Sequence, residues 1–343
     1  MLDIRKFNQQ ELTEQLSAWG EKPFRAKQVY DWLWKRGARN FDQMSNVSKA
    51  LREQLQSEFI LPVIETDEVQ RSTDGTIKSR FRLHDGHLIE SVLIPVPKDN
   101  RYTVCVSSQV GCSLSCTFCA TGRMKRARNL TAGEIYDQVL LVNEQCQSTY
   151  GHSLTNIVYM GMGEPLLAYQ PVMESIERIT SEQGMGWSAR RITISTAGIA
   201  KFIRQLADDN SKVNLALSLH AADDEKRNEI MPINNANNLA VLMDALEYYY
   251  RKTKNRISYE YIAFQDFNDS IEDAKRLAKL CRRFPVRINI IEYNPIDGTS
   301  FRKATEHRID DFAAYLRKQK IMVTVRRSRG KDIDAACGQL ANK

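Results

Sequence analysis

From residue 102 onwards, short β-branched runs alternate with amphipathic helical stretches, and this alternation restricts the possible folds more than any other feature. The apolar runs occupy residues 102–107, 156–161, 191–196, 214–220, 257–263, 287–293 and 321–326. Helical candidates lie between them, and the first, residues 131–147, begins with Thr131 and Glu134 in capping-box spacing. Strands that alternate with helices form parallel βαβ units. The pattern predicts an α/β fold, closed or partly closed into a barrel.

The first hundred residues follow other patterns. Residues 1–60 have helical periodicity and predict an N-terminal helical accessory domain. Residues 61–98 contain two Asp-Gly dipeptides, at positions 74 and 85, flanked by alternating segments, which predict a β-hairpin or meander connector. We therefore expect three parts, with residues 99–343 forming the core barrel.

Charge and cysteine content limit the classes of function. The chain has 49 Lys and Arg against 42 Asp and Glu, a net charge of +7, which permits a nucleic-acid partner without requiring one. The start, MLDIRKFNQQEL, lacks a secretory signal core, and no apolar stretch approaches the roughly 20 residues of a membrane span. We expect a cytoplasmic protein with no membrane attachment, in which clustered cysteines are metal ligands or catalysts.

Three cysteines stand close together in VGCSLSCTFCATG. Cys112, Cys116 and Cys119 have the spacing C-x3-C-x2-C, and the nearest histidines are His87 and His152. Structural zinc usually takes four Cys or His ligands, often as two C-x2-C pairs, and no second pair is present. Iron–sulfur clusters prefer thiolates, and a cubane held by three of them leaves one iron free. The spacing favours a [4Fe–4S] cluster over zinc.

Polar residues also stand where several apolar runs end. In a β/α barrel the active site gathers at the carboxyl ends of the strands, so polar residues at corresponding positions favour one shared site. A lone residue such as His220 is more often structural, and its place at a strand end favours a functional role. The residues at these ends are Gly163, Glu164, Ser195, Thr196, Ser218, His220, Asn294, Arg326 and Arg327.

The motifs together resemble a known family. CSLSCTFC resembles the cluster loop of the radical S-adenosylmethionine (SAM) superfamily, and YMGMGEP resembles its glycine/glutamate SAM-binding motif. With NLTAGEI, ALSLHA, MPIN, EYNPIDG, IDAACGQL and the cysteines Cys105 and Cys337, the chain is similar over nearly its whole length to the RlmN/Cfr family of RNA adenine methyltransferases. GMGEPL, with Pro165, is closer to the RlmN branch. The resemblance implies a partial (β/α)6 radical-SAM barrel with an N-terminal helical accessory domain.

The resemblance also assigns ligands. It implies that Cys112, Cys116 and Cys119 bind a [4Fe–4S] cluster whose free iron chelates SAM. The residues that it implies contact SAM are Gly163, Glu164, Ser195, Ser218, Leu219, His220 and Asn294.

The implied chemistry uses two SAM molecules per turnover. Carbon 2 of adenine is electron-poor, so it does not accept a methyl cation, whereas a carbon radical can add there. In the family, one SAM methylates Cys337, and a second gives a 5′-deoxyadenosyl radical that takes hydrogen from the S-methyl group. The methylene radical adds to adenine, and Cys105 releases the product by forming a disulfide with Cys337. Glu90 matches the family's proton acceptor, with a solvent-facing strand residue as the alternative.

Two basic segments lie close to candidate cysteines, one before Cys337 and one after the cluster loop. Residues 312–331 hold seven Lys or Arg and no acid, and GRMKRAR follows the cluster loop. They predict contacts with RNA phosphates, and a target base that leaves its stack favours a loop or bulge as substrate. The resemblance implies 23S rRNA, free or poor in protein, and adenosine 37 of tRNA as substrates, a donor such as flavodoxin or ferredoxin, and a monomer.

Three alternatives remain open from the sequence. A Cfr-like enzyme would methylate carbon 8 of adenosine in 23S rRNA with the same cysteines. A radical-SAM activase would act on a protein, and it has no need of Cys105 and Cys337 as a pair. A zinc-stabilised RNA-binding module would not be an enzyme.

Overall fold

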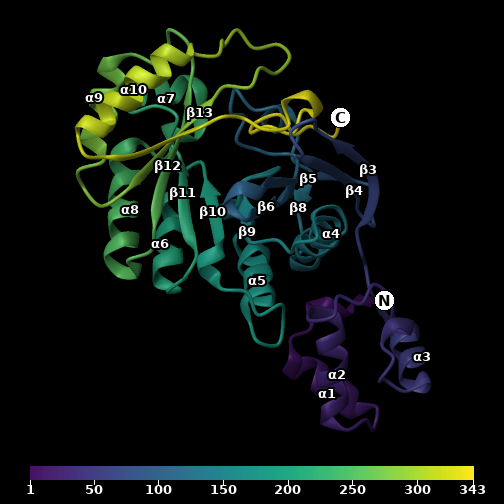
Figure 1. Ribbon diagram of the computed structural model, residues 1–343. Coiled ribbons are helices and arrows are strands. Elements are labelled where there is room, and N and C mark those ends of the chain that lie inside the picture. The colour runs from purple at the N-terminus through teal and green to yellow at the C-terminus, as the bar shows by residue number, and fades with distance from the viewer.

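The computed structural model describes residues 1–343, and a ten-stranded sheet organises the chain in the order β14-β13-β12-β11-β10-β9-β6-β5-β4-β3 (Figure 1). The strands from β14 to β6 pair in parallel throughout. They are β6 (Arg101–Cys105), β9 (Asn156–Tyr159), β10 (Ile192–Thr196), β11 (Asn214–Ser218), β12 (Ile257–Ala263), β13 (Arg287–Glu292) and β14 (Met322–Arg326). Each coincides with a predicted apolar run, and β14 remains an open edge, so the predicted partial barrel is confirmed.

A helix follows each parallel strand except β14. These helices are α4 (Ala132–Tyr150), α5 (Tyr169–Thr180), α6 (Ala200–Asp208), α8 (Leu239–Thr253), α9 (Ile271–Leu280) and α10 (Glu306–Lys318), with the short α7 (Asp224–Ile230) before α8. Figure 1 shows α6, α8, α9 and α10 along the outer side of the curved sheet. The predicted capping box starts α4, because Glu134 N donates to Thr131 Oγ1 and Thr131 N donates to a Glu134 carboxylate oxygen.

An antiparallel meander extends the same sheet. It consists of β3 (Glu65–Arg71), β4 (Ile77–Arg82) and β5 (Leu88–Val96), and β5 pairs with β6 of the barrel. The two turns contain Gly75 and Gly86 with φ of +87° and +82°, a conformation that glycine adopts without strain. The Asp-Gly dipeptides therefore lie in the hairpin turns, and the meander shares a sheet with the barrel.

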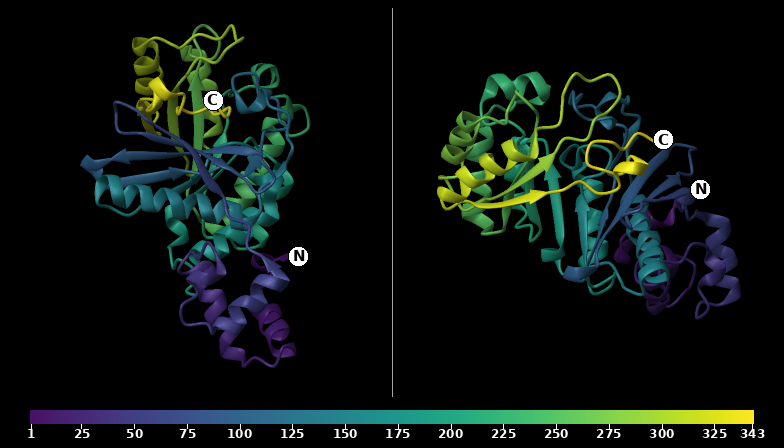
Figure 2. Two further views of the ribbon diagram at one scale, coloured as in Figure 1. Left: turned by 90° about the vertical axis from the view of Figure 1, so that its right-hand side faces the viewer. Right: turned by 45° about the horizontal axis from the view of Figure 1, so that its top comes forward.

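The N-terminal helices form a separate lobe at one end of the molecule, as both views of Figure 2 show. They are α1 (Gln9–Ala18), α2 (Pro23–Trp34) and α3 (Lys49–Glu58), and β1 (Leu2–Asp3) pairs with β2 (Phe59–Ile60). A buried ion pair joins the lobe to α4, with Arg5 Nη1 2.8 Å from Asp137 Oδ1. Tyr136 Oη donates to Trp34 O at 2.7 Å.

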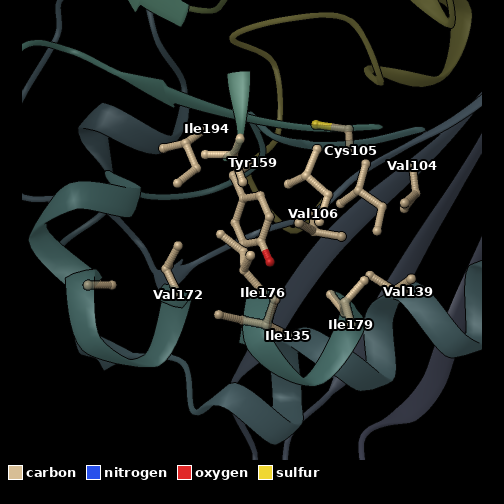
Figure 3. Packing of buried hydrophobic residues seen from close by; sticks show 14 of the residues in the cluster. Val104, Cys105, Val106, Ile135, Val139, Tyr159, Val172, Ile176, Ile179 and Ile194 are labelled. Atoms are coloured by element: carbon tan, nitrogen blue, oxygen red, sulfur yellow. The ribbon is translucent and has the colours of Figure 1, made fainter. Parts of the chain in front are cut away.

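The core below the cysteine-bearing strand is aliphatic. Figure 3 shows side chains of α4 and α5 packed against β6, β9 and β10, with Cys105 at the edge of the cluster. Tyr159 satisfies its hydroxyl by a 2.8 Å hydrogen bond to Ser175 Oγ. This packing fixes the carboxyl end of β6, where the cysteine loop begins. No helix has both the length and the apolar composition that crossing a membrane requires.

Candidate functional site

The three clustered cysteines lie on one loop after β6. The short antiparallel strands β7 (Gln109–Val110) and β8 (Arg128–Asn129) close its base. Cys119 N donates to Cys116 O at 3.2 Å, which makes a tight turn. Gly122 approaches this turn so closely that a Cβ there would lie 2.8 Å from Cys116 O. The loop therefore wraps compactly around partly buried sulfurs.

The donor set fits an iron–sulfur cluster. Burial raises the pKa of the Cys112 thiol to about 11, and burial with the charges of Cys119 and Cys112 raises the pKa of Cys116 well above its usual range. Leu114 and Phe118 supply an apolar wall. Three soft thiols without histidine suit iron–sulfur chemistry, in which each thiolate binds its own iron. No group of three or more Cys, His, Asp or Glu side chains is arranged around a single metal ion.

The glycine/glutamate motif connects the loop after β9 with the loop after β10. Gly163 has φ +97°, and a Cβ there would lie 2.5 Å from Gln109 Cβ, so the position needs glycine. Glu164 is buried, and its two carboxylate oxygens accept from Leu166 N at 3.0 Å and Ala197 N at 2.7 Å. Burial raises the pKa of Glu164 to about 7 despite these bonds.

The next two strand ends lie beside this motif. Ser195 Oγ of β10 is 3.3 Å from Ser218 Oγ of β11. His220 has φ +55°, and its Nδ1 accepts from Ile262 N at 3.1 Å. Burial lowers the pKa of His220 to about 3, so the ring is neutral and carries its hydrogen on Nε2. The ring meets Phe118 edge-on, with centroids 4.9 Å apart, so the SAM candidates reach the cysteine loop.

The other two candidate cysteines lie close to the same loop. Burial and then the charge of Cys337 raise the pKa of Cys105 to about 12. Solvent reaches Cys337, yet the surrounding protein, followed by the charge of Cys119, raises the pKa of its thiol to about 11. Asn294 Nδ2 donates to Cys337 O at 3.3 Å. All seven cysteines are free thiols. The fold therefore brings Cys105, Cys119 and Cys337 together.

The C-terminal segment, residues 338–343, is bound to the cysteine loop and to Glu90. Ala120 N donates to Gly338 O at 2.7 Å, and Thr121 Oγ1 donates to Leu340 O at 2.6 Å. The amides of residues 341 and 342 donate to Glu90 Oε2 at 2.9 and 3.1 Å. In Figure 1 the C-terminus accordingly lies beside the meander. These bonds hold Cys337 at the mouth of the barrel.

Glu90 lies inside the protein. Its side chain is 0% exposed, and its Oε1 is 3.3 Å from Nζ of Lys78, whose side chain is 3% exposed. The alternative of a solvent-facing strand residue is therefore wrong, and the role of proton acceptor stays a prediction. The pairing places a cation beside the buried carboxylate.

Sequence reasoning missed two residues that shape this site. Gln138 of α4 accepts from Ser107 N at 2.8 Å and from Ser91 Oγ at 2.7 Å, which fixes the chain just after β6. Arg227 of α7 is fully buried beside the strand ends. Neither has a sequence signal, because Gln138 fits any amphipathic helix and Arg227 stands in DEKRNEI, which is typical of a solvated helix.

An open cavity of about 390 Å³ lies against the cysteine loop. Three of its lining residues are cations that belong to the predicted basic segment, and Cys112 also lines it. Clustered cations at an open mouth suit an anionic polymer. The lining residues are Cys112, Ser113, Ser115, Gly122, Arg123, Met124, Lys125 and Arg126.

Known proteins match both parts of the chain. Residues 2–61 match the family described as the ribosomal RNA large subunit methyltransferase N-terminal domain, and residues 106–281 match the radical SAM superfamily. The probable dual-specificity RNA methyltransferase RlmN of Christiangramia forsetii is 52% identical over 99% of this chain and 96% of its own length. The dual-specificity RNA methyltransferase RlmN of Campylobacter fetus is 41% identical over 100% of this chain and 99% of its own.

A solved structure agrees. A radical SAM methyltransferase from Sphaerobacter thermophilus superposes with a TM-score of 0.94 at 40% identity, covering 100% of both chains. The hydrogenase maturase HydG, at 13% identity and a TM-score of 0.51 over 69% of this chain and 54% of its own, shares the fold alone. The chain therefore belongs to the RlmN family within the radical SAM superfamily and is a SAM-dependent RNA methyltransferase.

Proposed function

We propose that this enzyme methylates carbon 2 of one adenosine in 23S rRNA and of adenosine 37 in tRNAs, with Cys337 as the methyl carrier. The observation that carries the proposal is the convergence of Cys105 and Cys337 beside the cysteine loop, where each thiol acts on the pKa of a neighbour. An enzyme that passed the methyl group directly to a nucleophile would need neither cysteine. The relatives' name, dual-specificity RNA methyltransferase, supports two kinds of RNA substrate.

The chain's own residues hold the reactants. Cys112, Cys116 and Cys119 would ligate a [4Fe–4S] cluster, and Gly163, Glu164 and the residues at the ends of β10, β11 and β13 would hold SAM. Bound there, the cluster and SAM supply the carbon radical that abstracts hydrogen. The apolar wall at Phe118 and the buried strand ends exclude water from that reaction.

Cys337 first accepts a methyl group on sulfur and then carries it to the adenine carbon as a methylene. Glu90 takes the ring proton, and the thiolate of Cys105 attacks the Cys337 sulfur. The new S–S bond replaces the bond between that sulfur and the new carbon, which leaves with its electron pair and takes up a proton to become the methyl group, while the unpaired electron of the adduct stays with the disulfide. The charge of Cys337 contributes to the high pKa of Cys105.

The rival reaction is Cfr-like methylation of carbon 8, and the relatives' name does not favour it. The test is to isolate ribosomal RNA and tRNA from cells with and without the chain, digest them to nucleosides, and separate 2-methyladenosine from 8-methyladenosine by chromatography and mass. We expect 2-methyladenosine to disappear from both RNAs when the chain is absent. Loss of 8-methyladenosine instead would support the rival, and no change in either would refute both.

The remaining components follow from the same proposal. Two SAM molecules are consumed per turnover, one for Cys337 and one for the radical. A small electron carrier such as flavodoxin or ferredoxin supplies the electron, and the enzyme acts as a monomer in the cytoplasm. The cations at the mouth of the cavity, Arg123, Lys125 and Arg126, contact RNA phosphates.

A further inference from the structure

Arg227 is a fully buried cation on α7, behind the cysteine loop. Its Nε donates to Leu219 O at 3.1 Å, and its Nη1 donates to Asn234 Oδ1 at 2.6 Å. Its Nη2 donates to Ala197 O at 2.6 Å and to Ser218 O at 3.3 Å. Every one of these acceptors is neutral. Burying a charge without a paired counter-charge is costly, so this guanidinium needs a negative partner that the hydrogen bonds do not supply.

Two ionisable side chains lie near Arg227, Cys116 and Asp224, and burial lowers the pKa of Arg227 only to about 10, so it remains protonated at neutral pH. Asp224 is linked to Arg227 only through Asn234, whose Nδ2 donates to Asp224 Oδ1 at 2.8 Å. The remaining candidate for the partner is the cysteine loop, whose thiolates would be negative when they bind iron.

The helix that carries Arg227 is attached to that loop. Thr117, which directly follows Cys116, donates its backbone N–H to Ile230 O of α7 at 3.1 Å. Residues 114 and 118 of the loop pack with Ile230 in one small apolar cluster. The buried cation therefore lies on a helix attached to the loop, away from water, where charges interact strongly.

We propose that Arg227 is the buried counter-charge of the iron–sulfur cluster and stabilises its reduced state, without touching SAM or RNA. The inference rests on the proposed ligation by Cys116 and its two neighbours. A cubane held by three thiolates is anionic, and reduction adds one further negative charge. A fixed cation nearby favours the more negative state, and charge and burial are two means by which proteins set cluster potentials.

A second role of Arg227 is to bind the loops after β10 and β11 through the carbonyls of Ala197, Ser218 and Leu219. The experiment therefore needs variants that distinguish the loss of this structural role from the loss of the charge. Arg227→Gln removes the charge and part of the hydrogen bonding. Asn234→Ala is the control for packing, because it removes one hydrogen-bond partner of Arg227 and one of Asp224 and leaves both charges. Asp224→Asn removes the negative group on the other side of Arg227 and has the opposite electrostatic sign.

The test is an anaerobic redox titration of the reconstituted full chain, without SAM or RNA, read by the electron paramagnetic resonance of the reduced cluster. Iron and sulfide content are measured first. We expect Arg227→Gln to lower the ratio of reduced to oxidised cluster about tenfold at a fixed potential, which is a shift of about −59 mV for a one-electron couple. Asn234→Ala should stay within about twofold of the wild type, and Asp224→Asn should raise the ratio.

Each outcome decides the proposal. If the Arg227→Gln variant binds the cluster and has the wild-type reduction potential, the proposal is overturned. It is also overturned if Asn234→Ala shifts the potential as much as Arg227→Gln does, because the effect would then be structural. If Arg227→Gln does not assemble a cluster, Asp224→Asn decides, and an unchanged or more negative potential overturns the inference. A wild-type chain that binds no iron and sulfide would overturn the proposed function as well, whereas normal iron with unchanged potentials overturns the inference alone.

Discussion

Glu292 ends β13, and the basic segment before Cys337 is arranged around its buried carboxylate. Its Oε1 accepts from Arg327 Nη1 at 2.7 Å and lies 3.2 Å from Lys303 Nζ. Its Oε2 accepts from Lys331 Nζ at 2.9 Å and from Ser328 N at 3.4 Å. The Glu292 side chain is 1% exposed, whereas its three cationic partners are half-exposed. Glu292 therefore anchors the segment that leads to Cys337.

The pKa of Glu292 gives the size of this effect. Burial alone would raise the pKa, but Lys331, Arg327 and Lys303 lower it from 4.5 to about 2. Because the folded-state pKa lies below the unfolded one, the stabilisation is fully present above pH 4.5 and is lost as the pH falls from 4.5 towards 2. At about 1.36 kcal/mol per pKa unit this is about 3 kcal/mol, and solvent screening of the exposed partners reduces it to about 2 kcal/mol.

We expect Glu292→Gln to lower the free energy of unfolding by about 2 kcal/mol at pH 7, measured by urea unfolding followed by circular dichroism. The difference from wild type should be constant down to pH 4.5 and fall to about half at pH 3.5. Glu306→Gln is the control, because Glu306 lies 3.4 Å from the same Arg327 but is 71% exposed, so its loss should have little effect. Equal effects of the two variants, or an effect independent of pH, would refute the reasoning.

Four further predictions concern the catalytic and buried groups. Cys116→Ala should lose the cluster, and full iron content in this variant would contradict its role as a ligand. Cys337→Ala should keep the cluster but transfer no methyl group, and mass spectrometry of wild-type peptides should find a methyl group on Cys337. Cys105→Ala should leave RNA covalently bound, seen as a nuclease-sensitive shift on a denaturing gel, and normal release of methylated RNA would exclude it as the resolving cysteine. Lys78→Met leaves Glu90 buried without its cation and should cost about 3 kcal/mol in urea unfolding, most of which the added change Glu90→Gln should restore; unchanged stability of the single variant would refute the pairing.

The local patterns of the sequence were sufficient to predict the barrel. A strand and a helix each have a period that is visible within a few residues, so the seven apolar runs located all seven parallel strands. The capping box at Thr131 is local in the same sense, because its two partners are three residues apart. The cysteine spacing was also readable, since all three thiols stand on one short loop.

Contacts between distant segments were not predictable in this way. Glu90 accepts hydrogen bonds from residues 341 and 342, which are far along the chain and help to bury it. The sequence of β5 alone does not decide whether the Glu90 side chain faces the core or solvent. Arg227 has the sequence context of a surface helix, and its burial depends on carbonyls at the ends of β10 and β11. Such positions depend on three-dimensional packing, which a single sequence does not display.

The attachments of the C-terminal segment limit how Cys337 can work. The chain is held before the cysteine through Lys331 and Glu292, at the cysteine through Asn294, and one residue after it by the bond from Ala120 N to Gly338 O. With the backbone fixed on both sides, the sulfur can approach different partners by rotation about its own side-chain bond, which is fast compared with catalysis. Both neighbours are already within electrostatic reach, Cys119 on the cluster side and Cys105 on the β6 side. Under the proposed function, one sulfur would therefore serve methyl transfer and resolution without movement of the segment that carries it.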